Sequence, residues 1–206
     1  MIYVICGMIG SILMYVGDMF LYFFKEEIKG TYATKQIIQT MTQASYKRIM
    51  IGSLLAIPAC IFNCIGILHL NQIAISSTHA RNAMLLLLVS FISGAIYHSQ
   101  FMYFGILNRF NHTRDLDVAY KTYMYLLKNL VFGMYAASFL YLALMIGLKQ
   151  TILPWWYVFF TPLLVFLWIP LLKKLKQPLY MLLVGGWGNL PIVIYYIAVL
   201  VFLMKS

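Results

Sequence analysis

The sequence of 206 residues is poor in charge. Only 10% of its residues are Asp, Glu, Lys or Arg, and only 5 of them are acidic. Soluble domains are about a quarter charged and about half apolar. Because 63% of this chain is hydrophobic, its composition excludes an ordinary soluble domain and predicts a membrane protein.

Cysteine is also scarce. The three cysteines, Cys6, Cys60 and Cys64, lie within apolar runs, and no Cys-x-x-Cys pair occurs. The sequence therefore shows no disulfide framework of the kind found in small secreted proteins. Cys60 and Cys64 share a helix face and are expected to serve in packing. The first apolar run has no basic residue ahead of it and is long enough to span a bilayer, so no cleavable signal peptide is expected.

Long apolar runs are what the sequence does contain. A helix needs about 20 apolar residues to cross the hydrocarbon layer, and six runs meet this requirement. We therefore predict an all-α fold, a single domain over residues 1–206 that forms a bundle of six transmembrane helices. The predicted helices cover about 2–24, 49–70, 82–107, 129–148, 152–172 and 179–204.

Basic residues alternate between the two sides of this predicted bundle. Twelve Lys and Arg residues fall in the first, third and fifth loops, whereas the other side has only Arg81, Lys149 and Lys205. Because basic residues mark the cytoplasmic side, both termini are predicted to lie outside, in the inner (cytoplasmic) membrane of a bacterium. The net charge of +10 is then explained by topology and by anionic membrane lipids, and no nucleic-acid partner is predicted.

The first loop contains a short apolar pattern. Ile37, Ile38, Met41 and Ala44 recur at helical spacing, which predicts an amphipathic helix over about 34–46 on the inner leaflet. The alternative is a solvated linker.

Few ionisable side chains interrupt the apolar runs. Asp18 is the only acidic residue inside any of them, and His98 lies in the third run. A charge in the hydrocarbon layer costs several kcal/mol, about 2.5 to 3.5 on insertion scales, so it needs a reason. The first and third helices run in the same direction, which places Asp18 and His98 at similar depth. We predict that the two face each other, and that Asn189 joins their layer if the three helices are neighbours.

The chemistry of this layer leaves three functions open. An Asp–His pair can fix the tautomer of the histidine and make it a general base, and Ser93 or Ser99 would be nearby nucleophiles beside Tyr97. This arrangement suits a lipid-directed hydrolase with His98 as base. The same layer could instead bind or pass a small or lipid-like ligand. A third reading is a structural or interaction protein in which the pair only locks two helices.

Metal and cofactor sites are not indicated. His69 and His79 lie near the outer ends of their helices with no carboxylate or thiolate nearby, so no metal site is predicted. The sequence identifies no cofactor and specifies no oligomeric state.

Four motifs follow one another along the chain. They are Gly17-Asp18-Met-Phe-Leu-Tyr22, Arg48-Ile-Met-Ile-Gly52-Ser-Leu-Leu-Ala-Ile-Pro58, Ala95-Ile-Tyr97-His98-Ser99-Gln-Phe101 and Gly185-Gly186-Trp187-Gly-Asn189. In this order the chain resembles a family of bacterial six-helix integral membrane proteins known as a domain of unknown function. The resemblance covers nearly the whole chain and implies a fold, but it implies no activity.

Two narrower resemblances concern chemistry. The Gly-Asp-x-x-Leu pattern that starts at Gly17 is similar to one motif of bacterial lysoplasmalogenase-type membrane enzymes, whose other acidic and histidine motifs are missing here. The stretch from Ser93 to His98 is similar to membrane metal hydrolases of the alkaline ceramidase and adiponectin-receptor type. Those enzymes need a His-x-x-x-His near the C-terminus, and the sixth predicted helix has no histidine.

Overall fold

The computed structural model describes residues 1–23, 44–107, 114–172, 174–176, 178–186 and 188–205. Its regular elements are helices, and the described residues also contain one isolated β-bridge, between Ala74 and Thr151. The predicted all-α class is therefore confirmed. Nearly all of the predicted amphipathic stretch at about 34–46 lies outside the described residues.

Among the described residues, four stretches are long and apolar enough, by length and composition, to cross a membrane. This makes the protein a multi-pass membrane protein. The second stretch is a stack of shorter helices that starts before the predicted residue 49, and the fourth helix extends toward the N-terminus as far as Arg114. The elements are α1 (Ile2–Tyr22), the stack α3 (Tyr46–Leu54), α4 (Ala56–Gly66), η1 (Ile67–His69) and α5 (Leu70–Ile73), then α6 (Ser77–Leu107) and α7 (Arg114–Gly147).

The predicted helices at 152–172 and 179–204 are each divided in the structure. The first becomes a 3-10 helix η2 (Trp155–Phe160), α8 (Pro162–Phe166) and α9 (Ile169–Leu172), and the second becomes α10 (Leu179–Val184) and α11 (Leu190–Lys205). Proline lacks an amide hydrogen and breaks helical bonding, and three prolines lie in or beside the first segment. Glycine is a poor helix former, and three glycines precede α11 in the second. The breaks fall at these residues.

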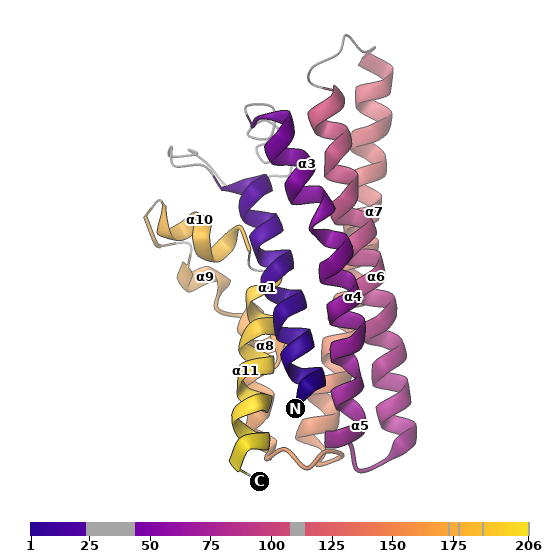
Figure 1. The fold of residues 1–206 in the computed structure, drawn as a ribbon, viewed down its shortest axis with the longest axis vertical. Coiled ribbons are helices and arrows are strands. Elements are labelled where there is room, and N and C mark those ends of the chain that lie inside the picture. The colour runs from indigo at the N-terminus through magenta and orange to yellow at the C-terminus, as the bar shows by residue number, and fades with distance from the viewer. Residues whose placement is uncertain (24–43, 108–113, 173, 177, 187, 206) are drawn as a thin grey trace.

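The long helices stand side by side, with α11 beside α1 and α8, while α9 and α10 project to one side near the C-terminal end of α1 (Figure 1). Both chain termini lie toward the opposite end of the molecule (Figure 1). The C-terminal end of α6 and the N-terminal end of α7 extend beyond the other helices (Figure 1). At 34 residues, α7 is about 51 Å long at 1.5 Å per residue, well over the roughly 30 Å of the hydrocarbon layer.

Small residues bring α1 against the stack of α3, α4, η1 and α5. A Cβ atom added to Gly66 would lie 2.4 Å from the Cα of Gly7, and one added to Gly17 would lie 3.0 Å from the carbonyl oxygen of Gly52. Such close backbone contact is how small residues drive helix association in lipid. Because the two helices touch along this line, the depth and rotation of α1 are fixed, and Asp18 is fixed with them.

A buried intramembrane polar network

Asp18 lies one turn before the end of α1 and is buried. The residue before it, Gly17, leaves room for the ring of His98 on α6, because a Cβ atom there would lie 3.1 Å from His98 Cε1. The absence of that one atom lets a side chain as short as aspartate reach the neighbouring helix.

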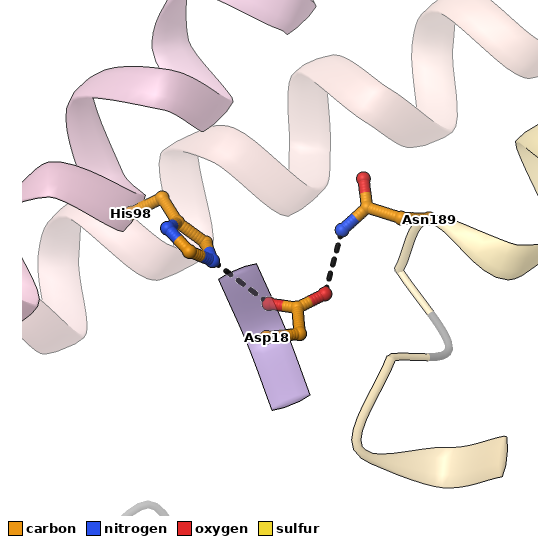
Figure 2. Close-up of polar contacts among 3 residues, drawn as sticks. All are labelled: Asp18, His98 and Asn189. Atoms are coloured by element: carbon orange, nitrogen blue, oxygen red, sulfur yellow. Dashed lines mark hydrogen bonds and ion pairs between the residues drawn. The ribbon is translucent and has the colours of Figure 1, made fainter. Parts of the chain in front are cut away.

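Both oxygens of the Asp18 carboxylate accept hydrogen bonds from other helices. His98 Nε2 donates to Oδ1 at 2.9 Å, and Asn189 Nδ2 donates to Oδ2 at 2.7 Å (Figure 2). All three residues are buried. The predicted contact of Asp18 with His98 is therefore confirmed, and Asn189 is in the same network. One carboxylate connects α1, α6 and the start of α11.

The hydrogen bond to Asp18 places a proton on Nε2 of the imidazole. When Nε2 carries the proton, the neutral ring has its lone pair on Nδ1. This Nδ1 atom points away from Asp18 (Figure 2), is buried, and has no hydrogen-bond partner among the described residues. Most buried polar atoms have a partner, so this acceptor is an exception that function can explain.

Asn189 sits at the break between α10 and α11. Its backbone amide donates to Gly186 O at 3.0 Å, and its carbonyl accepts the amide of Ile192 at 3.0 Å, so it opens α11 while its side chain reaches Asp18. The N-terminal end of a helix carries partial positive charge. The N-terminal end of α11 therefore stabilises a negative charge on Asp18.

Tyr15 holds this break against α1. Its hydroxyl donates to the carbonyl oxygen of Leu182 at 2.8 Å. Its ring lies against Gly186, where an added Cβ atom would be 2.1 Å from Tyr15 Cδ2. The interruption in the last helix is thus seated on α1 within one turn of Asp18.

The other predicted site residues lie near His98 in sequence but make different contacts. Ser93 Oγ donates to Val89 O at 2.7 Å, and Ser99 Oγ donates to Ile96 O at 2.8 Å. Tyr97 stacks edge-on against Phe101 with 5.0 Å between ring centroids. The structure brings together Asp18, His98 and Asn189, and it directs both serine hydroxyls to backbone carbonyls.

Arg48 makes contacts with the end of α1 that the sequence does not predict. Its Nε donates to Phe20 O at 2.6 Å, and its terminal nitrogen donates to Met19 O at 3.1 Å and to Phe23 O. In the sequence, Arg48 serves as a marker of topology and as the start of the second motif, and neither use predicts this contact. A usable signal was present, because α1 ends among apolar residues that cannot cap it and an arginine opens the next apolar run.

The two other histidines among the described residues have separate partners. His69 Nδ1 donates to Gly66 O at 2.7 Å, and its Nε2 accepts from the hydroxyl of Tyr195 at 2.9 Å. His79 Nδ1 lies 2.9 Å from the Tyr141 hydroxyl. In the part of the chain that the structure describes, no group of three or more His, Cys, Asp or Glu side chains is placed to hold a metal ion.

Comparison with known proteins identifies the family. The chain matches a family of unknown function, DUF6796, over residues 1–206, and it therefore belongs to that family. No curated protein and no solved structure matches it.

Proposed function

We propose that this DUF6796 protein binds or passes a small ligand at the network of Asp18, His98 and Asn189, and that the ligand brings a hydrogen-bond donor or a positive charge. One observation carries the proposal. A single buried carboxylate joins three helical elements, and one of them is interrupted at the residue that contacts it.

The donor requirement follows from the hydrogen bonds. Asp18 accepts at both oxygens, and His98 with a single ring proton on Nε2 offers an acceptor at Nδ1. A ligand that reaches this layer meets the lone pair of His98 Nδ1 and the negatively charged carboxylate of Asp18. Ammonium ions, alkali cations and hydroxyl groups suit such a site, whereas anions are repelled.

The helix break supplies the part that can move. Discontinuous transmembrane helices carry the substrate and ion sites of many transporters, because their free ends offer polar backbone groups at membrane depth. Here α10 and α11 meet beside Asp18, and Asn189 belongs to the junction. A shift of this junction would exchange the Asn189 contact for a contact with the ligand.

The experiment is a thermal-unfolding screen of the purified protein in lipid nanodiscs. The probes are sodium, potassium, ammonium, ethanolamine and glycerol, with chloride and acetate as anions. We expect at least one cation or hydroxyl compound to raise the unfolding temperature of the wild type in a saturable manner. Asp18→Asn and His98→Gln should abolish that increase.

Matched controls separate binding from general damage. Asn63 is a buried asparagine that bonds Ser11, and His69 is a buried histidine that bonds Tyr195. Asn63→Ala and His69→Gln should lower stability but keep the response to the ligand. If no probe stabilises the wild type, or if the controls lose the response equally, the binding proposal fails.

Lipid-directed hydrolysis with His98 as general base is the second candidate. The free acceptor at Nδ1 favours it, because a base needs an available lone pair. Since both nearby serine hydroxyls donate to backbone carbonyls, the nucleophile in this reading is water. Mass spectrometry of phospholipid liposomes that contain the protein tests it. Products that form with the wild type and disappear with His98→Gln would support hydrolysis.

We also propose that the divided segments at 152–172 and 179–204 complete a six-span bundle in a bacterial cytoplasmic membrane, with both termini outside. The support is the excess of basic residues, twelve against three, on the side of the first, third and fifth loops. Single cysteines placed at Lys174 and Lys205, in a variant with serine at the three native cysteines, test this with a membrane-impermeant thiol reagent. Labelling of position 205 alone in intact cells is expected, and the reverse result would invert the bundle.

A further inference from the structure

We propose that the described residues of 167–184, which are 167–172, 174–176 and 178–184 and include α9 and α10, bind the headgroup of an anionic phospholipid. This segment, the elbow, stands beside the C-terminal end of α1 and projects from the bundle (Figure 1).

Charge is the first observation. Lys174 and Lys176 are exposed in the turn, and neither forms a salt bridge with a described residue. The last acidic residue of the whole sequence is Asp117, so no acidic side chain lies near these lysines in the sequence. A phosphate headgroup is the negative partner that a membrane supplies.

The apolar surface around the lysines is the second observation. Leu167, Trp168 and Leu171 are 69%, 60% and 64% exposed. Tryptophan is enriched at the boundary between headgroups and acyl chains. An exposed tryptophan and leucines next to two lysines match both parts of a phospholipid, the acyl chain and the charged head.

The elbow is packed against α1 through its helix α10. Met181 is buried, Tyr15 donates to the carbonyl of Leu182, and Met19 Cε lies 3.2 Å from the position that a Gly185 Cβ atom would take. The lysines therefore precede a helix, α10, that is packed against α1.

The test titrates purified full-length protein in detergent with dioleoylphosphatidylglycerol and, separately, with dioleoylphosphatidylcholine, and native mass spectrometry counts the bound lipids. Each lysine near an anionic surface contributes roughly fivefold in affinity. We expect the wild type to bind phosphatidylglycerol in preference to phosphatidylcholine. The double variant Lys174→Gln with Lys176→Gln should bind phosphatidylglycerol more than tenfold more weakly.

A matched variant provides the control. Lys149→Gln with Lys205→Gln removes the same charge from two exposed lysines elsewhere in the chain, and it should bind phosphatidylglycerol like the wild type. Equal loss in both variants would show diffuse attraction and would overturn the site, as would equal binding of the two lipids.

A soluble competitor distinguishes a lipid from a free phosphate compound. Glycerol 1-phosphate has the charged head without acyl chains, so it should not displace the lipid at millimolar concentration, and Trp168→Ala should weaken lipid binding. Displacement by glycerol phosphate, together with an unaffected Trp168→Ala variant, would contradict the lipid assignment.

Discussion

Arg48 closes the end of α1 by donating a hydrogen bond of 2.6 Å from its Nε to the carbonyl oxygen of Phe20. The last carbonyls of a helix have no partner within it, and the C-terminal end carries partial negative charge that favours a cation. Because Phe20 is two residues beyond Asp18, the arginine also holds the turn that presents the buried carboxylate.

The first prediction concerns this arginine. Arg48→Ala should lower the free energy of unfolding by about 3 kcal/mol, because hydrogen bonds to charged groups contribute roughly 1.5 to 3 kcal/mol each and act here as one unit. Arg48→Lys should recover only part of the loss, since an ammonium group cannot cover several carbonyls in a plane. Unfolding in detergent, followed by circular dichroism, measures both.

Lys47→Ala is the control for Arg48→Ala. It removes the same charge from the adjacent, exposed position of α3, and its effect should stay within about 0.5 kcal/mol. A similar loss in both variants would mean that charge at this end, rather than the contacts of Arg48, stabilises the protein.

The second prediction is a double-mutant cycle on Asp18 and His98. Removing one partner of a buried pair costs roughly 3 to 5 kcal/mol, because the other is left uncompensated. Asp18→Asn should hurt less than Asp18→Leu, since the amide keeps an acceptor. Asp18→Ala combined with His98→Ala should destabilise less than the sum of the single changes. Additive effects in thermal unfolding would mean that the two side chains do not stabilise each other.

The third prediction concerns Asn189. Asn189→Ala should cost roughly 1.5 to 3 kcal/mol, the usual value of a hydrogen bond to a charged acceptor. Asn189→Asp should cost more. It replaces the amide nitrogen that lies 2.7 Å from Asp18 Oδ2 with a carboxylate oxygen, so two negative charges would face each other. The same unfolding assay ranks the two variants. If Asn189→Asp were the more stable, the donor role of Asn189 would be wrong.

The fourth prediction compares two glycines at the helix break. A Cβ atom on Gly186 would lie 2.1 Å from the ring of Tyr15, whereas one on Gly188 would meet nothing within 4 Å. Gly186→Ala should therefore destabilise by about 1 to 3 kcal/mol, the usual range for overpacking, and expose α10 to limited proteolysis. Gly188→Ala should do neither. Adding Tyr15→Leu to Gly186→Ala should restore part of the stability if the clash with the ring is the cause.

The depth of Asp18 and His98 in the membrane could be predicted from the sequence. Asp18 and His98 lie in long, unbroken apolar runs, so counting residues from the helix ends places them in one layer, and burial cost forces them to pair. The same counting placed Asn189 in this layer, but it did not reveal where the later helices are divided. Proline and glycine divide the segments at 152–172 and 179–204, and hydropathy alone does not reveal where a chain turns sideways.

Contacts between helices were less predictable than depth. Arg48 reaches α1 across a long loop, and the serine hydroxyls return to carbonyls of their own helix. Both outcomes depend on helix rotation and on side-chain rotamers, and spacing in the sequence specifies neither.

The shortness of α11 bears on the thickness of the membrane around it. Its 16 residues cover about 24 Å at 1.5 Å per residue, several ångströms less than the roughly 30 Å hydrocarbon layer. Such mismatch costs fractions of a kcal/mol per ångström and is relieved when the bilayer thins locally. In the proposed six-span bundle, the lipid beside α11 is therefore expected to be compressed. This compression would draw headgroups and water toward the level of Asn189, so the buried carboxylate would lie closer to an aqueous phase on this side than on the side of the continuous helices.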